Sequence, residues 1–183
     1  MKTESIVKYV ARLAITLLLI TSVVAAALAG VNSITAPAIA KLKAEKIMNA
    51  IEQVLPGGGE SVAFTDDSGW VSTVYQGETG YAVEVTPTTG FNGAITMMVG
   101  IDNAGNVLGI SVVTQTETAG LGAVAAATTS AGEAFRSQYI GLSGSVSVTK
   151  DGGQVEAITG ATITSRAICD GVNAALACVA NMG

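Results

Sequence analysis

A Gly-Ala step flanked by hydroxyl-bearing residues is the part of this chain best suited to chemistry. Residues 156–165 read Glu-Ala-Ile-Thr-Gly-Ala-Thr-Ile-Thr-Ser. Gly160 and Ala161 carry little bulk, so the backbone can turn sharply there and a large group can approach the Thr162 hydroxyl from outside. The stretch therefore predicts an accessible threonine nucleophile.

The residues that follow this step favour a helix. Apolar side chains recur at helical spacing through residues 166–182, and Thr164 or Ser165 is a suitable N-cap. The apolar positions are Ile168, Val172, Ala175 or Leu176, and Val179. Thr162 would then lie beside the positive end of a helix, which favours an anion such as a phosphodiester. A plain capped turn without a ligand is the alternative that these residues leave open.

Residues 156–162 also resemble the flavinylation motif of the FMN-binding domain family: an acidic residue, two variable positions, Ser or Thr, Gly-Ala, and an acceptor Thr. Members carry FMN joined through its phosphate to that threonine by a dedicated flavin transferase. The resemblance implies that FMN is attached covalently to Thr162 and that the transferase recognises Glu156, where the family usually has Asp. The neighbouring cofactor-binding residues that it implies are Thr159, Gly160, Ala161, Thr164 and Ser165.

A second segment, residues 115–122, resembles the other motif of the family, a His-x-Glu-Thr-Pro-Gly-Leu-Gly run about forty residues before the acceptor. Gln115 replaces the His and Ala119 the Pro. Glycines let backbone pack closely against a flat ring, and a leucine offers it an apolar contact. A simple loop between a strand and a helix is the alternative. The cofactor-binding residues expected here are Glu117, Thr118, Gly120, Leu121 and Gly122.

A third segment, residues 90–93, has the Gly-aromatic-x-Gly pattern with which the family enters a hairpin. Two apolar runs follow, and the Asn- and Gly-rich residues 103–106 between them predict a β-hairpin turn. We interpret the two strands of this hairpin as a scaffold for residues 115–122 that need not touch the cofactor chemically.

The N-terminal part of the chain predicts a membrane anchor. No charged residue occurs in residues 13–40, and a helix needs about twenty apolar residues to cross a bilayer. A cleaved secretory signal is the competing interpretation, because Ala27-Leu-Ala29 is a fair cleavage site, but the uncharged run is long for one. We expect an N-terminal segment at 1–12, an anchor at 13–34, a helical stalk with a Gly-rich hinge at 35–59, and one domain at 60–183.

The remaining pattern predicts a single α+β domain with a mainly antiparallel sheet and packed helices. β-branched residues are frequent in five stretches, and the Ala-rich residues 122–138 favour a helix. The expected strands are residues 70–75, 81–85, 94–101, 107–113 and 145–149. About 130 residues suffice for one hydrophobic core.

Composition excludes several classes of function. The chain has no histidine, which removes a Ser-His-Asp triad, a His-based metal site and a His general base. On one helix, Cys169 and Cys178 would lie about 13 Å apart on opposite faces, so they cannot pair. Residues 51–183 hold twelve carboxylates against three basic side chains, so no affinity for nucleic acid is expected. We therefore predict no metal site and no catalytic acid–base residues, which leaves electron transfer by a bound flavin.

The chain resembles the G-subunit family of Rnf complexes over nearly its whole length. The resemblance lies in the order of its parts: anchor, stalk, Leu-Pro-Gly hinge, 115–122 loop and late acceptor threonine. These couple ferredoxin:NAD oxidoreduction to sodium or proton translocation. The resemblance implies subunits A, B, C, D and E as partners, and places the FMN domain outside the cytoplasmic membrane. Alternatives are the C subunit of a sodium-pumping NADH:quinone reductase, a stand-alone flavinylated extracellular carrier, and a non-redox membrane-anchored binding or assembly protein.

Overall fold

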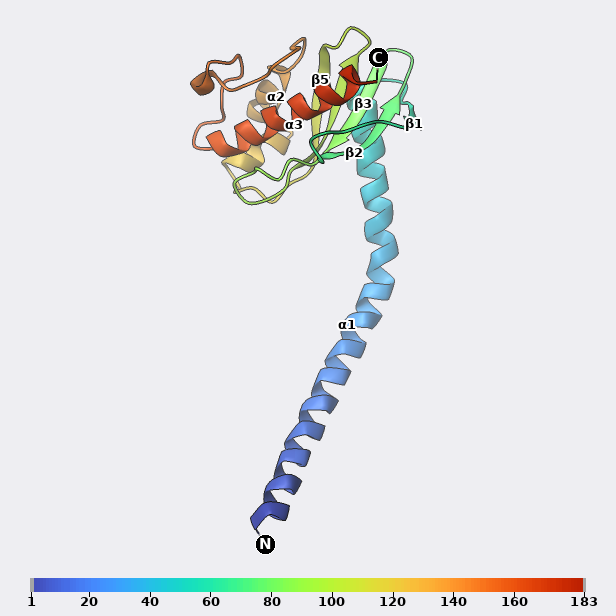
Figure 1. Cartoon of the computed structure of the whole chain (residues 1–183), viewed down its shortest axis with the longest axis vertical. Coiled ribbons are helices and arrows are strands. Elements are labelled where there is room, and N and C mark those ends of the chain that lie inside the picture. The colour runs from blue at the N-terminus through green and yellow to red at the C-terminus, as the bar shows by residue number, and fades with distance from the viewer. Residues whose placement is uncertain (1, 183) are drawn as a thin grey trace. The chain divides into compact units, whose positions relative to one another are not determined.

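The computed structural model describes residues 2–182, and within the first helix the side chains from Ile6 onward. Its contacts divide the chain into two compact units, Met1–Glu45 and Lys46–Gly183. Helix α1, Lys2–Val54, supplies the first unit and the first residues of the second (Figure 1).

The first unit is an apolar helix whose described large side chains are exposed on every side. The hydroxyl of Thr16 donates to the carbonyl of Arg12 at 2.8 Å, and that of Thr21 donates to the carbonyl of Leu17 at 3.0 Å. Such bonds satisfy a hydroxyl within its own helix, as a lipid environment requires. In length and composition, Ile6–Val54 fits a membrane span, although a signal sequence would have the same properties.

The second unit is built on an antiparallel sheet with the strand order β1-β2-β3-β4-β5. The strands are β1 Glu60–Val62, β2 Val71–Gln76, β3 Gly80–Val85, β4 Thr96–Asp102 and β5 Val107–Thr114. The predicted hairpin turn joins β4 to β5, where Asp102 accepts bonds from the backbone of Ala104 and Asn106 and Gly105 has φ +84°. The predicted α+β class with an antiparallel sheet is confirmed.

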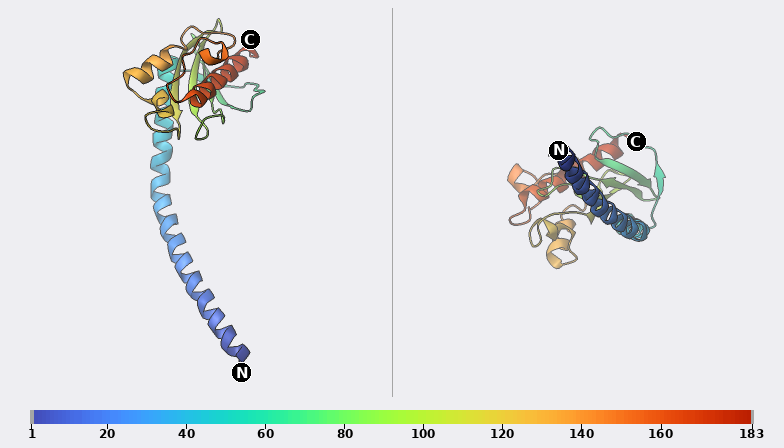
Figure 2. Two further views of the ribbon diagram at one scale, coloured as in Figure 1. Left: turned by 90° about the vertical axis from the view of Figure 1, so that its left-hand side faces the viewer. Right: turned by 90° about the horizontal axis from the view of Figure 1, so that it is seen from below.

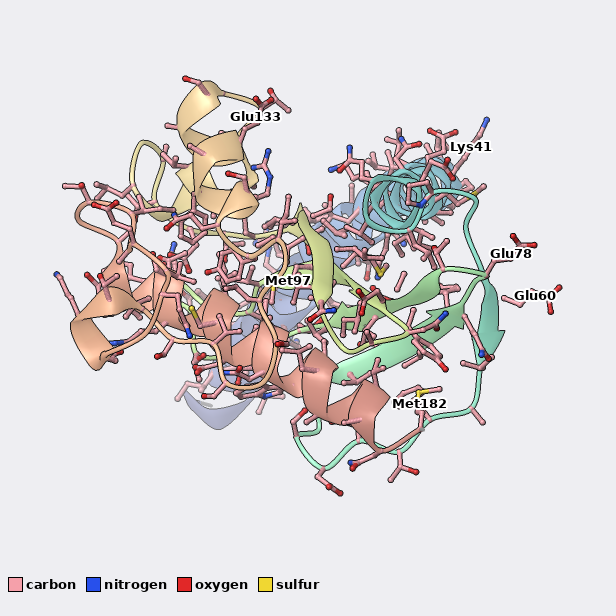
Figure 3. All side chains as sticks on the ribbon, turned by 90° about the horizontal axis from the view of Figure 1, so that it is seen from above. Lys41, Glu60, Glu78, Met97, Glu133 and Met182 are labelled. Atoms are coloured by element: carbon pink, nitrogen blue, oxygen red, sulfur yellow. The ribbon has the colours of Figure 1, made fainter. Side chains whose placement is uncertain are left out.

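One face of the sheet is covered by α3, Thr162–Ala180, as the two views of Figure 2 show. The residues that were expected at helical spacing face the core: Ile168, Val172, Ala175 and Leu176 are buried and Val179 is partly buried. Gly171 lets α3 pack closely on the sheet, because a Cβ there would collide with the Met97 side chain. Figure 3 shows Met97 between α3 and the strands.

The opposite face is covered by the end of α1 that belongs to the second unit. Ile51, Val54 and Leu55 are buried there against Ala82 of β3 and Met98 of β4. Helix α1 ends at Val54, before Pro56 and the glycines of the predicted hinge.

Two predicted elements differ in the structure, and one strand was not predicted. Residues 145–149 are not a strand: Val148 makes one parallel bridge to Val155, and the 3-10 helix η2, Thr149–Asp151, follows at once. The Ala-rich residues 122–138 form two short helices, η1 Gly122–Ala126 and α2 Ser130–Ser137, because the Thr129 hydroxyl caps a new helix by accepting from the backbone of Gly132. Strand β1 was not predicted, because three residues are too few to show alternation.

Candidate functional site

A cavity of about 340 Å³ opens at the start of α3, within the range of roughly 300–1,000 Å³ that is typical of small-molecule sites. Four segments far apart in sequence line it: the loop before β4, the 115–122 loop, η2, and the first turn of α3. The lining residues are Phe91, Glu117, Thr118, Leu121, Gly122, Lys150, Gly160, Ala161, Thr162, Ile163 and Thr164. Most of these residues were singled out by the sequence motifs.

Helix α3 begins at Thr162, and no side chain caps it. The expectation that Thr164 or Ser165 is the N-cap is wrong, because both lie inside the first turn and are buried. The Ser165 hydroxyl instead donates to the carbonyl of Ala161 and accepts from the backbone of Ile158, each at 3.0 Å. The first N–H groups of a helix have no intrahelical acceptor, so an uncapped start beside a cavity is suited to an anion.

The buried carboxylate of Glu117 joins three parts of the site. One oxygen accepts from the hydroxyl of Thr164 on α3 at 2.7 Å, and the other accepts from the backbone of Asn92 at 3.0 Å. Gln115, where the family motif has His, accepts from the backbone of Glu117 at 2.5 Å. Glu117 therefore holds the 115–122 loop against both the helix start and the loop before β4.

Glycine is required at two places in the wall of the cavity. Gly160 has φ +77°, a conformation that L side chains rarely adopt, and a Cβ there would lie 3.0 Å from Leu121 Cδ2. A Cβ at Gly122 would lie 2.5 Å from the Thr164 hydroxyl and 2.7 Å from the Glu117 carboxylate. The motif glycines thus keep the turn before Thr162 open and let the 115–122 loop approach α3.

Lys150 is a site residue that the sequence did not reveal. Its ammonium group donates to the Thr162 hydroxyl at 3.2 Å. It comes from η2, which no motif singled out, although a lysine shortly before the acceptor motif was the available signal. Thr162 is only partly buried, so its hydroxyl is accessible beside this cation.

Phe91 also lines the cavity, with 64% of its surface exposed. The loop that carries Phe91 is bonded to the 115–122 loop: the Asn92 side chain donates to the Thr116 carbonyl, and the Thr116 hydroxyl donates to the Asn92 carbonyl. An exposed aromatic ring beside a cavity is a suitable surface for a flat ligand.

Comparison with known proteins agrees with this geometry. The family model described as "FMN-binding domain" matches residues 90–177, from the loop before β4 into α3. The G subunit of the Na(+)-translocating ferredoxin:NAD(+) oxidoreductase complex of Acetobacterium woodii is 32% identical over 96% of this chain and 94% of its own length. The G subunit of the ion-translocating oxidoreductase complex of Methanosarcina acetivorans is 32% identical over 92% of this chain and 94% of its own. The chain belongs to this G-subunit family.

Other predicted site residues of this family member lie outside the cavity. Gly120, Thr159 and Glu156 line a neighbouring groove beside α2. The Gln138 side chain bonds to both backbone groups of Glu156. It accepts from the Glu156 N–H at 2.7 Å and donates to the Glu156 carbonyl at 3.3 Å. The Glu156 side chain is exposed, which suits recognition by another protein.

The two cysteines are buried, and they are not paired with each other, as predicted. Burial raises the pKa of both thiols, and the Cys169 sulfur also contacts the Tyr139 hydroxyl at 3.5 Å. They pack as small apolar side chains within the core. No group of His, Cys, Asp and Glu able to hold a metal ion occurs among the described residues.

Proposed function

We propose that this chain carries FMN as a phosphoester of the Thr162 hydroxyl and passes electrons through it within a membrane-bound Rnf complex. The observation on which this depends is the position of Thr162, a motif threonine at the uncapped start of a 19-residue helix, partly exposed beside a cavity. An ester phosphate placed there would meet unpaired backbone N–H groups and the positive end of the helix dipole.

The residues around the cavity fit the rest of the cofactor. Phe91, Leu121 and Ile163 offer apolar surface, and each is at least 42% exposed, so a flat ring could cover it. Glu117 and Thr118 supply polar atoms in the same wall. FMN, when bound, supplies one- and two-electron chemistry, so the protein has only to hold, orient and electrostatically tune it.

Family membership supports the larger assignment. We propose that the chain acts with subunits A, B, C, D and E of an Rnf complex. This complex would couple ferredoxin:NAD oxidoreduction to sodium or proton translocation. In support, the name of the Acetobacterium woodii relative states sodium translocation and ferredoxin:NAD oxidoreduction for its own complex. In this proposal the apolar segment of α1 anchors the chain in the cytoplasmic membrane, and the FMN domain lies on the extracytoplasmic side. Residues 1–12, 13–34, 35–59 and 60–183 remain our proposed cytoplasmic segment, anchor, stalk with hinge, and FMN-binding domain.

Covalent attachment also explains why a transferase is needed. In this step the donor would be a flavin nucleotide whose FMN phosphate is joined to a second phosphate group. The Thr162 hydroxyl would lose its proton, Oγ1 would bond to the FMN phosphorus, and the P–O bond to the second phosphate would break, so that this phosphate leaves with the electron pair. The product equals the chain plus FMN minus water. We propose that the transferase reads Glu156 and the turn at residues 159–161. Attachment would keep FMN from being lost outside the cytoplasm, and the membrane tether would raise its effective concentration near neighbouring redox centres.

Intact mass spectrometry tests the proposal. The full chain is expressed with a flavin transferase, purified in detergent, and compared with Thr162→Ala and with Thr65→Ala, a control at an exposed threonine outside the site. We expect the mass of FMN minus water on the native chain and on the control, mapped by peptide analysis to Thr162, and no addition on Thr162→Ala. A bare native chain, or a flavin that persists in Thr162→Ala, would refute the assignment.

A further inference from the structure

The lysine beside the acceptor hydroxyl has no role in either sequence motif. Lys150 Nζ lies 3.2 Å from Thr162 Oγ1, and both residues line the same cavity. Oγ1 is the atom that would bond to phosphorus, so a cation in contact with it lies next to any phosphate attached there.

The position of Lys150 is maintained by a clamp between η2 and α3. Both oxygens of Asp151 accept from the guanidinium of Arg166, each at 2.7 Å, and Arg166 lies one helical turn after Thr162. Such a bidentate pair fixes direction as well as distance. On its other side, η2 is tied by the backbone of Thr149, which donates to the carbonyl of Val155 at 2.8 Å.

The other basic side chains of residues 51–183 are engaged elsewhere. Arg166 is paired with Asp151, and Arg136 donates to the carbonyls of Ala125 and Ala127 at 2.8 and 2.9 Å. Lys150 is thus the cation that this acidic domain presents to the cavity. The same wall also holds the Glu117 carboxylate, so an incoming phosphate meets a negative charge as well as the lysine.

We propose that Lys150 is a phosphate-binding residue of the threonyl-flavin site, with Asp151 and Arg166 as the pair that positions it. This inference rests on the proposed attachment of FMN to Thr162. Lysine binds phosphate as a point charge with three donors, and a hydrogen bond between charged groups is shorter and stronger than a neutral one. Lys150 therefore favours the loaded state over the bare hydroxyl and speeds the approach of a negatively charged flavin donor.

The test compares loading rates in the full chain. Native protein, Lys150→Gln, Lys150→Arg and the matched control Lys46→Gln, an exposed lysine that lines a different groove, are purified in detergent and incubated with a flavin transferase and its flavin donor. We expect Lys150→Gln to load roughly tenfold or more slowly, the size expected for the loss of one charge-assisted hydrogen bond. Lys150→Arg should recover most of the rate, and Lys46→Gln should match the native chain.

A second readout reports the contact directly. After complete loading, the ³¹P resonance of the phosphodiester should shift in Lys150→Gln but not in Lys46→Gln. Equal rates and an unshifted resonance in Lys150→Gln would overturn the inference, and so would a loss of loading in Lys150→Arg as large as in Lys150→Gln, because arginine keeps the charge. Failure of the native chain to take up flavin would instead refute the attachment at Thr162, which separates the two proposals.

Discussion

Glu117 is expected to determine how firmly the cavity is held together. Its carboxylate is 8% exposed and accepts one bond from the Thr164 hydroxyl and one from the Asn92 backbone. Hydrogen bonds to charged groups contribute about 1.5–3 kcal/mol each, so Glu117→Ala, which leaves both donors without an acceptor, should cost about 3–5 kcal/mol. Glu117→Gln keeps the shape and one acceptor oxygen, and its amide can donate to the Thr164 oxygen, so we expect about 1–2 kcal/mol.

Urea unfolding of the full chain in detergent measures these costs, with the fluorescence of the single tryptophan, Trp70, as the probe. Glu133→Ala is the control, because Glu133 is exposed on α2 and points away from the core in Figure 3. The Glu117→Ala variant should lose several times more stability than the control, and Glu117→Gln should fall between them. Equal losses of unfolding free energy in the Ala and Gln variants would refute the role given to the Glu117 hydrogen bonds, because a negatively charged acceptor would then add nothing to stability.

Three further predictions concern the walls and the clamp of the site. Gly122→Ala should destabilise the domain by about 1–3 kcal/mol in the same assay, because its methyl group would displace the Thr164 hydroxyl. Gly160→Val should lose flavin loading as measured by intact mass, because a β-branched residue cannot adopt φ +77° without strain; normal loading would show that an open turn is not required. The hydrogen bond from Arg166 lowers the pKa of Asp151. The stability that the clamp contributes is therefore complete above the ordinary carboxyl pKa, and it is lost as the pH falls through the lowered pKa of Asp151. A carbon-detected NMR titration should show the Asp151 midpoint rise toward its ordinary value in Arg166→Gln.

Much of the architecture followed from local patterns in the sequence. The hairpin between β4 and β5 was predicted because Asn and Gly interrupt two apolar runs, and Asp102 accepts the backbone bonds that close that turn. Helix α3 was predicted because its buried residues recur at the helical period. Both features depend on neighbouring residues alone, which is the information that a single sequence holds.

Predictions failed where contacts a few residues away decide the local structure. Ser165 has the side chain of a helix cap, but it is fully buried and bonds to Ala161 and Ile158, and α3 already begins at Thr162. Residues 145–149 have a β-branched pattern, but Val148 makes a single bridge to Val155 and η2 begins at the next residue, Thr149. In both cases bonds to residues four to seven positions away outweighed the intrinsic preference.

The motifs singled out Thr162 and the 115–122 loop, but they could not show which charges surround them. Glu117 lies 45 residues before Thr162, and the fold brings it to the first turn of α3, where it holds Thr164. The fold also brings Lys150 to the same turn, where it contacts the Thr162 hydroxyl. A buried carboxylate beside the cavity disfavours an anion there, whereas the uncapped helix and the lysine favour one. Lys150 and the uncapped helix start therefore offset the Glu117 carboxylate at the phosphate that we propose on Thr162, and removal of the Lys150 charge should weaken that site.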